Sequence, residues 1–189
     1  MNLADIYRAS DVQRWQIVKT AKQQSVAEHS FGVAMIADRL ASTILAGTGH
    51  RGICVMWAMW HDLPEVYTGD IATPLKLHIK SQCESDPLAT FEGELCGPEY
   101  RHWHRMATET HPEVAAVVKL ADIIESCKFL AQNAMTDHGR DVRAKLTCAV
   151  VEKIGAFKKL WPDYNWDVAG DILREVVSGP ERHMDDILE

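Results

Sequence analysis

Four side chains of the kinds that bind metal ions fall where helical periodicity turns them toward a protein interior. They are His29, His61, Asp62 and Asp122. His29 and Asp122 each lie on an apolar helical stripe, shared with Val33, Ile36 and Leu40 in the first case and with Val114, Val118 and Ala121 in the second. His61 and Asp62 directly follow the apolar run Cys54–Trp60. Taken singly, an inward His is more often a hydrogen-bonded core residue, and an inward Asp is more often a cap or an ion-pair partner.

The combination of these four residues predicts a divalent-metal site. A buried carboxylate is costly unless it is paired or binds a metal. Imidazole suits Zn, Fe, Ni or Co, and carboxylates suit Mn or Mg as well. Two imidazoles and two carboxylates from three helices would leave coordination positions for water or substrate, as a catalytic site requires.

The elements that must position these residues are predicted to be helices. Ser25 to Glu28 form a capping box, and the helix that it opens carries His29 and ends at Gly47-Thr48-Gly49. A second helix is expected from Arg51 to about Val66, with Gly69 as its break. The pair His111-Pro112 begins a third helix, which runs through about Ala134 and carries Asp122, because Pro is well placed at the first helical position.

The rest of the chain also favours helices. Residues 139–160 and about 166–177 predict two more, and the tail after Gly179 is expected to fray. Residues 75–108 are ambiguous because Pro87 and Gly97-Pro98 interrupt them. No segment shows the period-2 alternation of a strand. The fold class is therefore predicted to be all-α, a helical bundle in one domain over residues 1–189.

Composition excludes several function classes. The formal charge of −7, from 20 Lys and Arg against 27 Asp and Glu, argues against binding to a nucleic-acid duplex, which depends on basic residues. There is no basic amphipathic segment for a membrane surface and no apolar run long enough to span one. Five widely spaced Cys without a Cys-x-x-Cys motif and an N-terminus without signal-peptide features predict a cytoplasmic protein with reduced thiols.

The motifs that contain these residues resemble a known family. Glu28-His29, His61-Asp62-x-x-Glu65 and the late Asp122 are similar to the motifs of HD-domain metal-dependent phosphohydrolases. Longer segments resemble both the YfbR-type 5′-deoxynucleotidases and the phage enzymes (DatZ-type) that remove triphosphate from dATP: Arg14-Trp15, Ser25 to Ser30, His61 to Lys76 and Lys119 to Asp122. The resemblance covers about residues 10–130 of a single HD domain, with C-terminal helices over 139–189.

The resemblance implies roles for individual residues. His29, His61, Asp62 and Asp122 match the metal ligands of the family. Glu65 lies one helical turn after His61 and would face the metal, where a carboxylate orients or deprotonates the attacking water.

The substrate-facing residues also follow from the resemblance. Arg14 and Lys76 match positions that meet phosphate, and Asp70 one near the sugar or the attacking water, although Asp70 is equally well read as a helix N-cap. Trp15 matches the wall beside the sugar and base, and Ile17 and Pro74 would shape the base pocket.

The resemblance also implies the reaction. The lead expectation is hydrolysis of dATP to deoxyadenosine and triphosphate, and the alternative is hydrolysis of deoxynucleoside monophosphates. One divalent ion (Co, Mn, Zn or Mg) is expected at the HD site, with a second metal brought by substrate phosphates as a further option. The partner is a small deoxynucleotide, and a homo-oligomer is expected. In a phage-encoded protein the compartment would be the host cytoplasm.

Two rival hypotheses belong to other classes. Cys83, Cys96, His102 and His104 would form a structural zinc site, but their spacing fits no familiar finger. A non-catalytic nucleotide-binding HD module is the other rival, and it has no need of Glu65. The remaining seven His residues are interpreted as ordinary.

Overall fold

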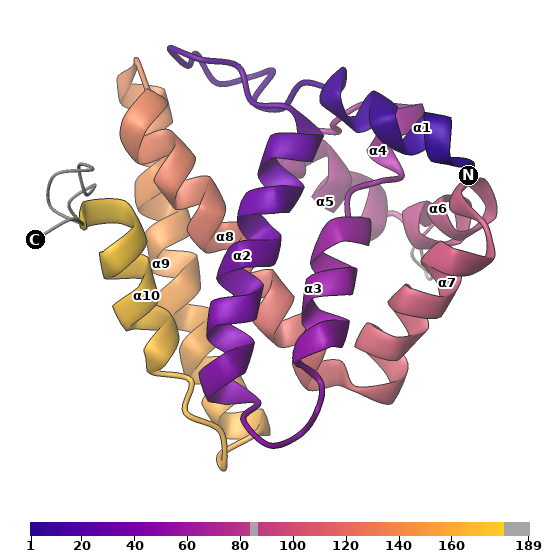
Figure 1. The fold of residues 1–189 in the computed structure, drawn as a ribbon. Coiled ribbons are helices and arrows are strands. Elements are labelled where there is room, and N and C mark those ends of the chain that lie inside the picture. Colours follow the sequence, from indigo (N-terminus) through magenta and orange to yellow (C-terminus); the bar gives the residue numbers. More distant parts are fainter. Residues whose placement is uncertain (84–86, 180–189) are drawn as a thin grey trace, which may run out of the picture.

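The computed structural model describes residues 1–83 and 87–179. In that part of the chain the secondary structure is helical, with two isolated β-bridges and no named strand, which confirms the predicted all-α class (Figure 1). The α-helices are α1 (Leu3–Tyr7), α2 (Val26–Ile44), α3 (Arg51–Trp60), α4 (Glu65–Thr68), α5 (Thr73–Ser81), α6 (Pro87–Cys96), α7 (Pro98–Arg105), α8 (Pro112–Asn133), α9 (Asp137–Leu160) and α10 (Val168–Ser178). A 3-10 turn (Arg8–Ser10) follows α1, and a π-helical segment (Met106–Thr110) follows α7.

The core lies where α2 packs against α3 and α8, and α9 and α10 cover the other side of α8. Figure 1 shows α2 at the centre of the molecule, with α9 and α10 on one flank and α6 and α7 on the other. Helix α8 is buried along most of its length because helices surround it. This arrangement brings polar residues of α2, α3 and α8 to a common interior.

The predicted capping box at the start of α2 is present. Ser25 Oγ accepts the backbone N–H of Glu28 at 3.1 Å, and the Glu28 carboxylate accepts the backbone N–H of Ser25 at 2.9 Å. These bonds satisfy two donors that a helix start leaves free. They fix the first turn of α2, so that His29 lies on its buried face and is 0% exposed.

The prediction of one helix from Arg51 to about Val66 is wrong. Helix α3 ends at Trp60, a turn covers residues 61–64, and α4 begins at Glu65. The cause is Pro64, which has no N–H for the Trp60 carbonyl and whose ring collides with that carbonyl in a continuous helix. Leu63 N–H donates to this oxygen instead, at 3.2 Å.

The ambiguous region 75–108 contains helices. Helices α5, α6 and α7 each begin at or beside a Pro, namely Pro74, Pro87 and Pro98. Proline at the first helical positions has no useful N–H to lose and already has a helical φ. The prolines therefore start helices here, in addition to separating them.

The C-terminal helices α9 and α10 agree with the prediction to within two residues at each end. They supply part of the core through Val150, Ala169 and Ile172, and the connection between them supplies Trp166. The expected fraying after Gly179 falls on residues outside the described ranges, and the single domain stays a prediction. None of the described helices combines the length and the apolar character needed to cross a membrane.

Candidate active site

The four predicted metal ligands meet between α2, the end of α3 and the middle of α8. One ligand atom each of His29, His61 and Asp122 lies within 4.8 Å of the other two. Asp62 Oδ2 lies 3.5 Å from His29 Nε2 and 3.4 Å from His61 Nε2. Asp122 Oδ1 lies 3.4 Å from His29 Nε2. The structure therefore brings together the set that the sequence predicts.

Both imidazoles present Nε2 to this cluster. His61 Nδ1 lies 2.8 Å from the Ala58 carbonyl oxygen, which can only accept, so Nδ1 carries the proton. His29 Nδ1 lies 2.5 Å from Glu125 Oε2 and donates to that carboxylate. The two Nε2 atoms are buried and have no hydrogen-bond partner among the described residues. A buried acceptor nitrogen without a partner is costly, and a cation would satisfy both.

The distances also fit a divalent ion. Metal–ligand bonds of about 2.0–2.1 Å at tetrahedral angles place neighbouring ligand atoms roughly 3.3 Å apart. The separations of 3.4 and 3.5 Å around His29 Nε2 are close to that value. The donor set of two imidazoles and two carboxylates suits Zn, Co or Mn.

The electrostatics of the cluster favour positive charge. Burial and the charge of Arg14 favour the neutral form of His29, but the nearby carboxylates of Asp122 and Glu125 outweigh them and raise its pKa to about 9. Burial favours the neutral form of Asp122 as well, but Lys119 and His29 hold the pKa of Asp122 well below its usual range. The carboxylates therefore stay ionised at neutral pH, as metal ligands must.

A chain of hydrogen bonds connects the cluster to Trp15, and sequence reasoning missed its two middle members. Trp15 Nε1 donates to Gln24 Oε1 at 2.8 Å, and Gln24 Nε2 donates to Glu125 Oε1 at 2.7 Å. Glu125 in turn holds His29. The available signal was that Glu125 lies three residues after Asp122, and therefore on the same side of α8. A Cβ at Gly32 would lie 2.8 Å from Glu125 Cγ, so the glycine makes room for this carboxylate.

Glu65 and Lys76 form a second pair beside the ligands. Lys76 Nζ donates to Glu65 Oε1 at 2.6 Å, while Glu65 Oε2 is buried and has no hydrogen-bond partner in the described part of the chain. Burial, and then the charge of Asp62, raises the pKa of Glu65 to about 8, although Lys76 opposes the shift. A carboxyl group with a pKa near neutrality is suited to proton transfer. The prediction that Glu65 shares a helix with His61 is wrong. The turn at residues 61–64 places Glu65 beside the ligands instead.

Asp70 lies close enough for its charge to raise the pKa of both Glu65 and Lys76. Gly69 has φ 73° and turns the chain after α4 toward it. The N-cap of α5 is Ala72, so the structure does not support the reading of Asp70 as a helix cap.

Arg14 and Trp15 border the cluster from the N-terminal segment. The Arg14 charge disfavours protonation of both His29 and Asp62. Arg14 Nη1 is buried, and none of the residues in 1–83 and 87–179 pairs with it. Its guanidinium carbon lies 5.6 Å from the Trp15 ring centroid, and that ring stacks on Phe129 with centroids 5.8 Å apart. Trp15 has φ 65°, a conformation that a bulky residue holds only when its contacts enforce it.

The structure does not join the two predicted base-pocket residues to the cluster. Ile17 is 61% exposed, and Pro74 is exposed at the start of α5. Neither belongs to a hydrophobic cluster of the described residues.

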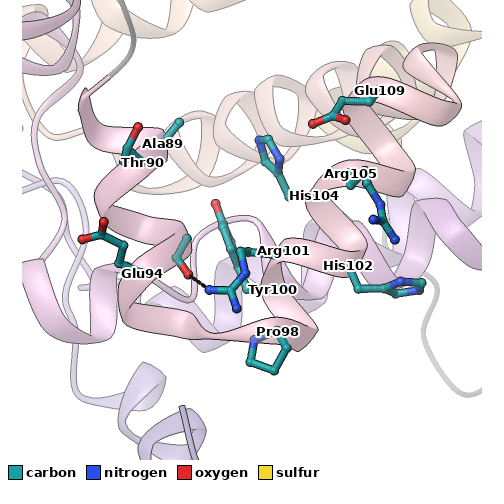
Figure 2. A pocket seen from close by; sticks show the side chains of 11 residues that line it. Ala89, Thr90, Glu94, Pro98, Tyr100, Arg101, His102, His104, Arg105 and Glu109 are labelled. Atoms are coloured by element: carbon teal, nitrogen blue, oxygen red, sulfur yellow. Dashed lines mark hydrogen bonds between the residues drawn. The ribbon is translucent and has the colours of Figure 1, made fainter.

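The structural zinc hypothesis receives no support. In residues 1–83 and 87–179, the groups that could hold a metal ion include none of Cys83, Cys96, His102 and His104. His102 and His104 instead both line a pocket of about 630 Å³ between α6 and α7, and Figure 2 shows their rings pointing in different directions. None of the predicted active-site residues lines that pocket.

Comparisons with known proteins identify the relatives of this chain. The model of the family described as "5′-deoxynucleotidase YfbR-like" matches residues 2–138. A dATP triphosphohydrolase of Acinetobacter phage SH-Ab 15497 is 35% identical over 94% of this chain and 91% of its own length. A 5′-deoxynucleotidase of Vibrio cholerae is 30% identical over 67% of this chain and 70% of its own.

A solved structure shows the same fold. It is the HD phosphohydrolase DatZ of cyanophage S-2L, described as bound to dA and one catalytic Zn²⁺ ion. The TM-score is 0.75 at 24% identity, over 95% of this chain and 98% of that one. The helical bundle is therefore an HD phosphohydrolase fold, as the sequence predicted. Since the family model covers well over half of its residues, this chain belongs to the YfbR-like 5′-deoxynucleotidase family.

Proposed function

We propose that this protein is a metal-dependent dATP triphosphohydrolase that converts dATP and water to deoxyadenosine and triphosphate. The observation that carries the proposal is the cluster of two unpartnered His Nε2 atoms and two carboxylates beside the Glu65–Lys76 pair. The choice of dATP rests on the phage relative of that name, which matches over 94% of this chain.

His29, His61, Asp62 and Asp122 would hold one divalent ion. Such an ion supplies Lewis acidity, which polarises a phosphoryl oxygen and lowers the pKa of bound water. Zn²⁺ is our first choice, because the ligand set suits it and the cyanophage neighbour is described with Zn²⁺. Co²⁺, Mn²⁺ and Mg²⁺ are the alternatives, and a second ion would enter with the substrate phosphates.

Individual residues of the chain then have separate roles in the hydrolysis. The attacking water forms a bond to the α-phosphorus, and the bond from that phosphorus to the 5′ oxygen breaks. Glu65 takes or orients the proton of the water through its free Oε2, and the 5′ oxygen gains a proton as it leaves. Lys76 and Arg14 balance the negative charge of the phosphates. Asp70 orients the water or the sugar.

The nucleoside would lie against Trp15. An indole ring beside the sugar leaves little room for a 2′-hydroxyl, which favours deoxynucleotides. Ile17 and Pro74 complete the base pocket in this proposal. Apolar contacts of this kind discriminate by about 1–3 kcal/mol per group, so the preference for one base is expected to be moderate.

Hydrolysis of deoxynucleoside monophosphates is the second candidate. The description of the family model and the Vibrio cholerae relative favour it. The same ligands serve both reactions, and the difference lies in the space and positive charge beyond the α-phosphate. Either enzyme would act on a free nucleotide in the cytoplasm, as a homo-oligomer.

Product analysis separates the two candidates. The protein is incubated with a divalent metal and a panel of deoxy- and ribonucleotides at the mono-, di- and triphosphate levels. Release of triphosphate from dATP supports the lead proposal. Release of phosphate from several deoxynucleoside monophosphates replaces it with the second candidate, and turnover of neither overturns both.

Glu65→Gln tests the catalytic assignment. The variant keeps the size of the side chain and removes its basicity, so hydrolysis should fall by about 10²–10⁴-fold, the usual contribution of a general base. Metal content and thermal stability should stay close to the wild type. The matched control is Glu152→Gln on the exposed face of α9, which should leave hydrolysis unchanged. Full activity of the Glu65 variant would remove Glu65 from the mechanism.

A further inference from the structure

A second group of metal-binding side chains lies at the starts of α3 and α8, away from the HD cluster. One ligand atom each of His50, His111 and Glu113 lies within 4.8 Å of the other two. Glu113 Oε1 is 3.0 Å from His50 Nδ1 and 3.8 Å from His111 Nδ1. The two imidazole rings are only 3.9 Å apart between centroids.

Local structure holds the three residues in place. His50 is the N-cap of α3, and its backbone N–H donates to Thr48 Oγ1 at 3.1 Å. Gly47 and Gly49 have φ of 80° and 79°, conformations that let the chain turn sharply between α2 and α3. His111 is the N-cap of α8, and Glu113 lies in the first turn of that helix. Figure 1 shows both helix starts at the lower edge of the molecule.

Among the described residues, the Glu113 carboxylate is paired with imidazoles and not with a Lys or Arg side chain. Glu113 is 8% exposed, and within the described residues its polar contacts are the two imidazoles. His50 Nδ1 is buried, and despite its nearness to Glu113 it is not directed to form a hydrogen bond. A buried carboxylate must be paired or bound to a metal. We propose that His50, His111 and Glu113 bind a divalent transition-metal ion, with Zn²⁺ as the preferred occupant.

The chemistry of the group selects zinc. Two imidazoles and one carboxylate are a known Zn²⁺ donor set, with the fourth position left to water. Separations of 3.0 and 3.8 Å bracket the roughly 3.3 Å between neighbouring tetrahedral ligands. The positive ends of two helix dipoles point at the group. They oppose every divalent cation alike, so the site would hold only an ion that imidazole binds strongly, as it does Zn²⁺.

The position of the site suggests what the ion would do. His50 and His61 are eleven residues apart along α3, and His111 and Asp122 are eleven residues apart along α8. At 1.5 Å per residue, the two sites are separated by about 16 Å along the same pair of helices. An ion at the second site would tie the start of α3 to the start of α8. It would thereby fix the two helices that position three ligands of the HD cluster, His61, Asp62 and Asp122.

Zinc stoichiometry tests the proposal without any activity measurement. The protein is stripped with a chelator, reconstituted with Zn²⁺ in the absence of nucleotide, desalted and analysed for zinc per chain. We expect about two ions for the wild type and about one for His50→Ala and for His111→Ala. The matched control His138→Ala changes an exposed His of α9 and should keep about two.

A combination of variants distinguishes this proposal from the HD assignment. Asp122→Ala should lose the HD ion and keep about one, and adding His50→Ala should remove the remaining ion. One ion in the wild type, lost on Asp122→Ala and kept on His50→Ala, would overturn the second site and leave the HD site intact. If a variant does not fold, the wild-type stoichiometry decides the question, since a single ion per chain contradicts the proposal.

Discussion

At the scale of single residues, the HD cluster depends on Glu125, a carboxylate that lies outside the motifs identified in the sequence. Glu125 fixes the tautomer of His29, because the proton on Nδ1 leaves the Nε2 lone pair facing the other ligands. It also accepts from Gln24, which in turn holds the Trp15 indole. Glu125 is therefore a positioning residue for both the metal and the substrate wall.

Glu125→Gln should weaken metal binding at the HD site. Removing a carboxylate that orients a ligating His typically lowers metal affinity by about 10–100-fold. The metal concentration that gives half-maximal hydrolysis should rise by this factor, while activity at saturating metal stays closer to the wild type. The control Glu152→Gln should show no shift. An unchanged metal requirement for the Glu125 variant would mean that His29 is oriented by other contacts.

Some residues of the site were predictable and others were not. His29 and Asp122 could be placed because a polar residue on an apolar stripe must face the interior. Gln24 could not, because it acts through contacts with residues far away in the sequence. The role of Ile17 and Pro74 in the base pocket was predicted from the family resemblance alone. Helical periodicity did not predict where their side chains lie, so the structure had no such prediction to confirm.

At the scale of elements, the break between α3 and α4 determines the position of Glu65. A continuous helix would have taken Glu65 further along the α3 axis. The turn at residues 61–64 lets α4 fold back, so that Glu65 meets Lys76 of α5. Pro64 is visible in the sequence, but the apolar pattern from Arg51 to Val66 favours a continuous helix. The region 75–108 is ambiguous from the sequence for a related reason, since Pro87 and Gly97-Pro98 interrupt it.

Gly69→Ala should destabilise the protein. Gly69 has φ 73° and ψ 166°, a region that is essentially restricted to glycine. A Cβ there meets no atom within 4 Å, so the cost is backbone strain alone, about 1–3 kcal/mol. For a chain of this size, each kcal/mol lowers the Tm by about 2–4 °C. Because Asp70 and Lys76 follow this turn, hydrolysis should fall as well.

Gly155→Ala is the matched control for that substitution. Gly155 is exposed in the interior of α9, and its added Cβ would also find open space. Alanine in a helix interior is favoured over glycine by about 0.5–1 kcal/mol. The Tm should therefore rise slightly and hydrolysis should not change. Equal Tm changes in the two variants would contradict the assigned role of the Gly69 conformation.

At the scale of the whole molecule, the negative charge and the positive pocket residues are compatible. The formal charge of −7 belongs to the whole chain, whereas Arg14 and Lys76 lie beside the HD ligands. A small polyanion such as a nucleotide can reach this local positive charge. For a duplex we expect the net negative charge of the chain to oppose binding.

The C-terminal part of the chain, residues 135–189, contains none of the identified motifs but contributes to stability. The family model stops at residue 138, and residues 135–189 added little to the sequence-based assignment. In the structure, however, α9 and α10 close the core around α8. Trp166, in the connection between them, is 0% exposed, and its Nε1 donates to the Trp161 carbonyl at 2.9 Å. Its ring also packs on Phe157, with centroids 5.2 Å apart.

Trp166→Ala should therefore destabilise the whole molecule although it lies outside the motif-bearing region. Truncating a fully buried Trp costs about 3–5 kcal/mol, through lost burial and the cavity left behind. Urea unfolding should show the midpoint falling by a corresponding amount at an unchanged slope. Leu160→Ala, at a side chain that is 65% exposed at the end of α9, should stay within about 0.5 kcal/mol of the wild type. A loss for Trp166→Ala as small as that of the control would mean that α2, α3 and α8 hold the HD ligands together without the C-terminal helices.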